Sequence, residues 1–205
     1  MWNFLGGKGR FDGKPSWSVS GPAAMLYGGI GCYFIYATIR YLTAEDGGAY
    51  TSLFWVIHGP IHEIGHFFFS SGRFPLTIHL LAGTLFQVLA PVVGAIQFAW
   101  RGEYPPLAVM LGWFGFSVLD VSVYMADARR LELTLVSPFA GEGETIHDWN
   151  WLFDRFGCLS CAEGIAAVTA SFGYLCCFLS IFGIAWMVLR GLRRRAAADG
   201  EDERF

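Results

Sequence analysis

His62, Glu63 and His66 stand at the spacing that zinc-dependent hydrolases use for two metal ligands and a base. Residues four apart share one face of a helix, so the imidazoles of His62 and His66 can reach the same zinc ion. Glu63 projects beside them, where it can accept a proton from a water molecule. The motif therefore predicts a zinc site with two histidine ligands and Glu63 as the general base.

A hydrolytic zinc site takes three protein ligands, so the third must come from elsewhere in the chain. Asp120, His147 and Asp127 are the candidates. Asp120 ranks first, because it lies inside a predicted span at the same depth from the helix end as the histidine pair. His147 is the alternative ligand, with Asp127 orienting it. A surface pair with a neighbouring arginine is an equal alternative for Asp127.

Two further polar residues lie in apolar surroundings near the motif. Gln87 could bind a substrate backbone or a ligand side chain, although an amide in a membrane more commonly makes an interhelical contact. His58 lies one turn before His62 on the same helix face, and we interpret it as a supporting residue rather than a ligand.

The elements that must position these residues are membrane helices. The 205-residue chain is 54% hydrophobic and only 15% charged, against about 25% charged residues in an ordinary soluble domain. Apolar stretches long enough to cross a bilayer, which takes about 20 helical residues, separate the charged clusters. We predict five spans, at roughly 21–42, 50–69, 77–99, 106–126 and 164–189.

Together, residues 1–205 are predicted to form one all-helical transmembrane domain. Residues 1–20 form an N-terminal segment without the apolar core of a cleaved signal peptide. The loop 128–160 carries a predicted interfacial helix over 146–156, rich in aromatic and charged residues. The charged segment 196–205 predicts a disordered tail.

Several classes of function and structure find no support. No basic stripe with interleaved aromatic residues is present, so nucleic acid is not an expected partner. Cys158 and Cys161 form a single C-x-x-C without the second pair that a four-cysteine zinc site needs, and packing thiols are expected. Five spans would leave seven Lys and Arg residues on each side of the membrane, so the positive-inside rule gives no orientation.

The motif, with an aspartate in a later membrane helix, resembles the site-2 protease type of intramembrane zinc metalloprotease. That resemblance rests on His62, Glu63 and His66, and more weakly on Asp120, which is followed by Val121 where the family typically has glycine. It implies zinc binding by the histidines and the aspartate, activation of water by the glutamate, and peptide cleavage in or beside the bilayer.

The chain is also similar to compact, uncharacterised bacterial membrane proteins. They pair such a motif with elements like Gly83-Thr-Leu-Phe-Gln87, Asp127-Ala128 and His147-Asp148-Trp149. This second resemblance concerns the architecture and names no substrate.

The sequence thus predicts an integral-membrane zinc hydrolase, a peptidase, in the bacterial cytoplasmic membrane. Its expected partners are the lipid bilayer and a single-span membrane protein as substrate, and partners in a larger membrane complex are not identified. The alternative is a non-catalytic membrane subunit or a transporter-like protein that retains a metal or proton site.

Overall fold

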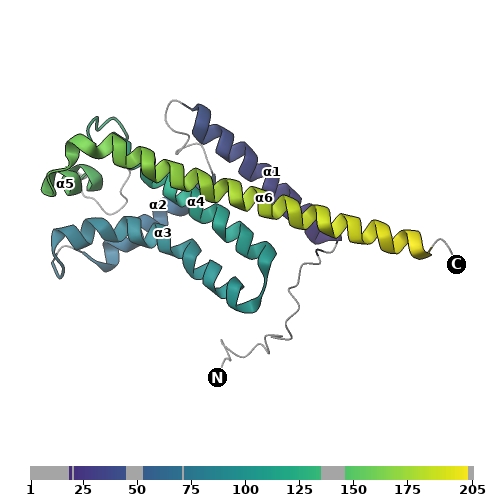
Figure 1. The fold of residues 1–205 in the computed structure, drawn as a ribbon. Coiled ribbons are helices and arrows are strands. Elements are labelled where there is room, and N and C mark those ends of the chain that lie inside the picture. Colours follow the sequence, from purple (N-terminus) through teal and green to yellow (C-terminus); the bar gives the residue numbers. More distant parts are fainter. Residues whose placement is uncertain (1–18, 20, 45–52, 71, 135–145, 203–205) are drawn as a thin grey trace, which may run out of the picture.

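The computed structural model describes residues 19, 21–44, 53–70, 72–134 and 146–202, and over these residues the chain is all-helical. Figure 1 shows the helices side by side, with the last one running the length of the molecule. In chain order they are α1 (Gly21–Thr43), α2 (Leu53–Phe68), α3 (Leu76–Arg101), α4 (Tyr104–Asp127), α5 (Asp148–Arg155), the short 3-10 helix η2 (Leu159–Cys161) and α6 (Ala162–Asp202).

Four of these helical segments are long and apolar enough to cross a membrane: α1, α3, α4 and the continuous stretch Leu159–Ala197. Their outward faces carry large apolar side chains, such as Leu89 and Val93 on α3 and Phe182 on α6, which are 50%, 66% and 71% exposed. Several polar side chains lie inside instead. An apolar exterior around paired polar groups is compatible with an integral membrane protein.

The helix ends follow local signals in the sequence. Gly102 ends α3 in the left-handed conformation (φ 66°), and prolines occupy the first turn of α4, where a missing N–H costs nothing. The last helix differs from the prediction: α6 continues through Ala196 to Asp202, where the composition predicts a disordered tail. The N-terminal segment apart from Val19, and residues 135–145 of the predicted loop, lie outside the described residues.

The second helix starts halfway along the bundle. Phe54, near the beginning of α2, stacks on Phe116 in the middle of α4 with ring centroids 4.3 Å apart. Its ring also lies 5.9 Å from that of Phe34, in the middle of α1. The Tyr33 hydroxyl accepts a hydrogen bond from the backbone N–H of Leu53 at 2.9 Å and so pairs one of the free donors at the start of α2.

The contacts along α4 show that α1 and α2 run in the same direction. On α1, Phe34 packs on the middle of α4 and Tyr41 reaches Asp120, nearer the end of α4. On α2, His58 meets Asp120, and the ring of His62 lies 6.2 Å from that of Tyr124, nearer still to the end of α4. Both helices are therefore parallel to α4.

This direction differs from a series of five full spans, because consecutive spans must alternate in direction. Length and hydropathy identify apolar segments but carry no information on direction, which is why the sequence could not distinguish α2 from a full span. The residues that connect α1 to α2, 45–52, lie outside the described part of the chain.

α4 and α6 form the most extensive helix pair among the described residues, and two glycines allow their close approach. A Cβ at Gly115 would lie 2.7 Å from Cys177 Sγ and 2.9 Å from the carbonyl oxygen of Gly173. A Cβ at Gly173 would lie 3.0 Å from the Gly115 carbonyl oxygen. Small residues at this crossing let the two backbones approach, as is common between membrane helices.

Replacing Gly115 by alanine should therefore weaken this crossing. The methyl group meets backbone atoms that cannot rotate away, so we expect a loss of about 1–3 kcal/mol in stability. The measurement is thermal unfolding of the detergent-purified protein. Gly28→Ala is the matched control, because a Cβ at Gly28 in α1 meets nothing within 4 Å. Equal melting temperatures for the two variants would contradict this account of the interface.

Candidate metal centre

The histidine pair of α2 lies directly against the backbone of α3. Gly65 sits on the carbonyl of Ala82 with no room for a side chain between them. One step along α3, a Cβ at Gly83 would lie 2.5 Å from His66 Nε2 and 2.6 Å from His62 Nε2. The close approach of α2 and α3 therefore places two Nε2 atoms over a glycine, and the missing side chain leaves space beside both rings.

Hydrogen bonds on the far side of each ring set which nitrogen carries the proton. His66 Nδ1 lies 2.9 Å from the carbonyl oxygen of His79, which can only accept, so Nδ1–H donates and Nε2 keeps a lone pair. His62 Nδ1 lies 3.3 Å from Gln87 Oε1. The Gln87 amide is oriented by its own donation from Nε2 to the carbonyl of Ser117 at 3.3 Å, so Oε1 accepts from His62.

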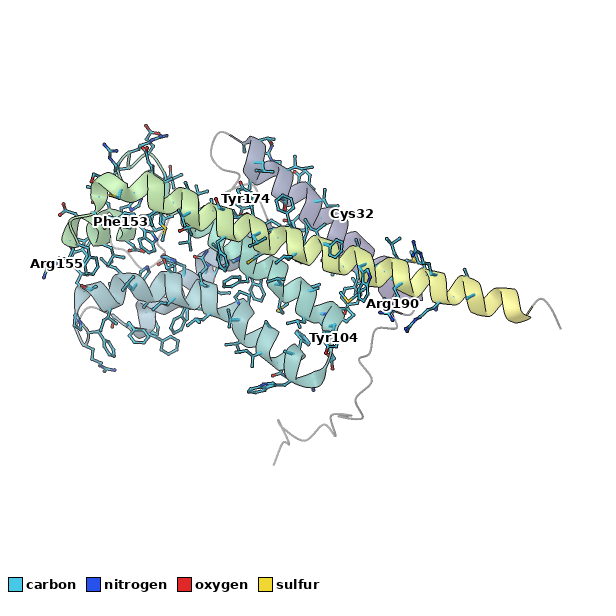
Figure 2. The ribbon with its side chains drawn as sticks, viewed as in Figure 1. Cys32, Tyr104, Phe153, Arg155, Tyr174 and Arg190 are labelled. Carbon is cyan, nitrogen blue, oxygen red and sulfur yellow. The ribbon has the colours of Figure 1, made fainter. Side chains whose placement is uncertain are left out.

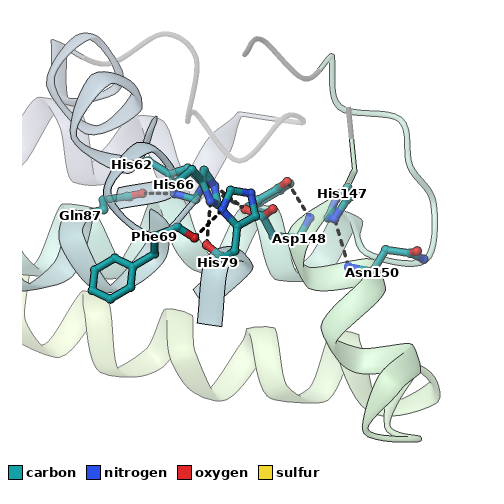
Figure 3. A network of polar contacts seen from close by, with 9 residues as sticks. His62, His66, Phe69, His79, Gln87, His147, Asp148 and Asn150 are labelled. Atoms are coloured by element: carbon teal, nitrogen blue, oxygen red, sulfur yellow. Dashed lines mark hydrogen bonds and ion pairs between the residues drawn. The ribbon is translucent and has the colours of Figure 1, made fainter. Parts of the chain in front are cut away.

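The third member of the cluster is Asp148, at the first position of α5. Its Oδ2 lies 3.0 Å from His62 Nε2 and 3.1 Å from His66 Nε2, and the two Nε2 atoms are 2.9 Å apart (Figure 3). Three atoms that offer lone pairs thus meet at one point. Such atoms repel one another at this distance unless a cation lies between them, either a proton or a metal ion.

Electrostatics favour an ionised Asp148. Burial alone would raise the pKa of its carboxyl group, but a proton held between Asp148 and the Nε2 atoms of His62 and His66 outweighs burial and lowers the pKa below the usual value. The carboxylate is therefore negatively charged at neutral pH. When a metal ion replaces that proton, two neutral imidazoles and one carboxylate form a common ligand set for zinc.

Glu63 completes the cluster on α2. One ligand atom from each of His62, Glu63 and His66 lies within 4.8 Å of the other two. The carboxylate of Asp148 approaches the histidines more closely, at 3.0 and 3.1 Å. We therefore place Asp148 in the ligand set and Glu63 beside it, as the motif predicts for a base.

The start of α5 is held in place by its N-cap. His147 Nδ1 accepts from the backbone N–H of Asn150 at 3.1 Å, and the Asn150 side chain donates to the carbonyl of Ala128 at 2.8 Å. The backbone N–H of Asp148 donates to the Tyr124 hydroxyl at 3.1 Å. These contacts join the start of α5 to the end of α4 and aim Asp148 at the histidines.

Asp127 supports this N-cap from the other side. It accepts from the backbone N–H groups of Glu132 and Leu133 at 2.9 and 3.2 Å. Its Oδ2 lies 3.3 Å from His147 Nε2, within the distance of an ion pair, although the direction is poor for a hydrogen bond. Burial lowers the pKa of His147 despite the nearby Asp127 carboxylate, which acts to raise it.

The structure places Asp120, which the sequence favours as third ligand, in a different cluster. Its carboxylate pairs with Nδ1 of His58 and accepts from the Tyr41 hydroxyl. Trp113 Nε1–H donates to His58 Nε2 at 2.9 Å, so His58 must donate from Nδ1. Asp148 thus takes the position predicted for Asp120. Asp120 lies on the face of α4 that meets α2, but one turn short of the predicted depth: it is level with His58, whereas Tyr124 is level with His62.

The structure also shows where the other candidate residues, His147, Asp127 and Gln87, lie. His147 caps α5 and packs against the Tyr124 ring, with centroids 4.2 Å apart and the ring planes tilted by 36°. Asp127 lies against His147 and the backbone that follows α4, and Arg130 pairs with Glu163 at 3.7 Å. Gln87 makes the interhelical contact that was the commoner expectation. No pattern in the sequence singled out Asp148 itself, although it stands between the N-cap His147 and Trp149, where a helix begins.

No protein-family model, curated protein or solved structure matches the chain.

Zinc binding should depend on Asp148 and not on Asp120. We expect Asp148→Ala to lower zinc affinity by more than the roughly 10–100-fold typical of losing a residue that only orients a ligand. Asp120→Asn keeps the size and an acceptor for His58, and should retain near-stoichiometric zinc. The metal content of detergent-purified protein, measured by mass spectrometry after dialysis, separates the two. Zinc lost from Asp120→Asn but kept by Asp148→Ala would reverse the assignment.

Gly83→Ala tests the space beside the rings without removing a ligand. The new methyl group would lie against both Nε2 atoms, so we expect most of the bound zinc to be lost. Gly59→Ala on α2 is the control, because a Cβ there meets nothing within 4 Å. Thermal unfolding of both variants checks that the fold survives. Unchanged zinc affinity in a folded Gly83→Ala protein would show that the ion does not bind at this position.

Proposed function

We propose that the protein is an integral-membrane zinc hydrolase, and more specifically a peptidase. The observation that carries the proposal is the meeting of His62 Nε2, His66 Nε2 and Asp148 Oδ2 within 3.1 Å of one another. The partners of the two Nδ1 atoms leave both Nε2 lone pairs directed at this point. A zinc ion satisfies all three atoms at once, which a single shared proton does not.

The residues of the chain fit the requirements of a catalytic zinc site. Three protein ligands leave one position for water or substrate, whereas a structural site has four. Bound here, zinc would polarise a substrate carbonyl and make water more acidic. Glu63 accepts the proton of the attacking water and can return it to the leaving amine. Gln87 and the carbonyl of His79 hold the two rings in the tautomer that ligation needs.

The depth of the cluster bears on the substrate. His66 lies in the last turn of α2, His79 in the first turn of α3, and Tyr124 in the last turn of α4. The cluster is therefore near the end of the bundle rather than at its middle. We propose a substrate that presents a peptide segment at the membrane surface, such as the flank of a single-span protein.

We propose that α5 lies in the headgroup region beside this cluster, in a bacterial cytoplasmic membrane. Leu152 and Phe153 face the bundle and are buried, whereas Asp154, Arg155 and Phe156 are exposed. A short helix with one apolar and one charged face suits an interface. Because α5 carries Asp148, its position at the surface would couple the third ligand to the lipid boundary.

The alternative function is a transporter-like or non-catalytic membrane protein that uses a proton site. The buried cluster of Asp120, His58, Tyr41 and Trp113 favours it, because ionisable groups inside a membrane are costly and commonly functional. In that case Asp120→Asn abolishes function while zinc binding is unaffected. In the hydrolase, the same variant keeps both zinc and turnover.

Glu63→Gln separates metal binding from chemistry. The substitution keeps the shape and a hydrogen-bonding side chain but removes the basic carboxylate. We expect zinc and thermal stability to remain, while cleavage falls by about 10²–10⁴-fold, the usual contribution of a general base. The assay is co-expression with tagged single-span proteins, followed by comparison of cleavage with the parent. Parental cleavage rates in Glu63→Gln would overturn the mechanism even if zinc is present.

A further inference from the structure

Different helix termini meet at the two ends of the bundle. Val19 and Ala24 at the start of α1 pack with Met187, late in α6, and with Tyr104 at the start of α4. We call this the α1 end. At the opposite end, Met125 of α4 and Phe153 of α5 pack around the start of α6, and we call this the α5 end. Figure 2 shows Tyr104 and Arg190 towards one end and Phe153 and Arg155 at the other.

Tracing the chain between these ends gives four crossings. α1 runs from the α1 end to the α5 end, α3 returns, α4 runs to the α5 end, and α6 returns again. α2 begins beside the middle of α1 and also ends at the α5 end, where His66 meets His79 of α3. The described part of α2 therefore lies in the half of the bundle nearest the α5 end, where the preceding helix α1 ends and the following helix α3 begins. The chain therefore begins its first span and ends its last at the α1 end.

With this topology, the Lys and Arg residues are no longer divided equally between the two sides of the membrane, as they are with five spans. Residues of the α1 end, or adjoining it in the sequence, include nine of the 14 Lys and Arg: Lys8, Arg10, Lys14, Arg101, Arg190, Arg193, Arg194, Arg195 and Arg204. The α5 end has the other five: Arg40, Arg73, Arg129, Arg130 and Arg155. All nine adjoin short loops or span ends, which are the positions that the positive-inside rule counts.

The last helix strengthens this assignment. α6 has 41 residues, or about 60 Å at 1.5 Å per residue, twice the hydrocarbon thickness of about 30 Å. It must therefore project from the membrane. At the α1 end the projecting part carries Arg193, Arg194 and Arg195, which are exposed and well placed for the anionic headgroups of the cytoplasmic leaflet.

We infer that the α1 end faces the cytoplasm and that the cluster of His62, His66 and Asp148 opens to the extracytoplasmic side. Resting on the hydrolase proposed above, this assigns the substrate class: segments of membrane or secreted proteins at the outer surface of the membrane, not cytoplasmic ones. The location of the cluster itself depends only on the fold.

Cysteine labelling of the full chain in bacterial spheroplasts tests this orientation. Cys161 lies exposed and Cys158 partly exposed beside α5, so a membrane-impermeant maleimide should label the parent from outside, and Cys158→Ser with Cys161→Ser should lose the label. Adding Ala196→Cys to that double variant places a thiol on the exposed projecting part of α6. It should react only after permeabilisation.

The reverse pattern, with Ala196→Cys labelled from outside and Cys161 only after permeabilisation, overturns the inference. If neither thiol reacts, alkaline phosphatase is fused to the C-terminus, because this enzyme is active only outside the cytoplasm. An inactive fusion supports the orientation, and an active fusion overturns it. Zinc content is measured on the same preparations. A zinc-loaded protein with the opposite orientation would refute the sidedness alone, whereas a correctly oriented protein without zinc would refute the proposed hydrolase.

Discussion

Repulsion between three lone pairs is the constraint on which this end of the molecule depends. His62 Nε2, His66 Nε2 and Asp148 Oδ2 lie within 3.1 Å of one another, with no apolar side chain between them because Gly83 has none. Separate elements must hold these atoms together against their repulsion. α2 supplies the rings, α3 supplies acceptors for their outer nitrogens, and the capped start of α5 supplies the carboxylate. A cation at this point, either a proton or a metal ion, offsets that repulsion.

A proline in α3 shows how this support extends beyond direct neighbours. Pro91 has no N–H, so the carbonyl of Gln87 four residues earlier has no helical donor. The hydroxyl of Ser117 on α4 donates to that carbonyl at 3.0 Å, and the backbone carbonyl of Ser117 accepts from the Gln87 side chain. In an apolar bundle, such a freed backbone group needs a partner from a neighbouring helix. The contact between Gln87 and Ser117 thereby pairs the free carbonyl of α3 and also holds the Gln87 amide that orients His62.

The sequence predicts the elements of this structure better than their directions and contacts. Spacing predicted that His62 and His66 share a face with Glu63 next to it, because the helical period alone decides this. Hydropathy located the long helices, yet it could not show that α2 starts halfway along the bundle, since this follows from the packing of Phe54 on Phe116. Asp148 escaped prediction for a similar reason: its role depends on how α5 docks, and a short polar helix has no periodic signal that encodes docking.

The two polar clusters on α2 lie on one stripe of the helix and yet have different surroundings. His58 is 2% exposed and is held on both ring nitrogens, by Trp113 and the Asp120 carboxylate. One turn later, the side chain of His62 is 13% exposed and has one nitrogen directed at the open cluster. A fully paired histidine can anchor a helix but has no lone pair left for a ligand. His58 therefore fixes the rotation and depth of α2, and this leaves the next two histidines on the same stripe directed at Asp148.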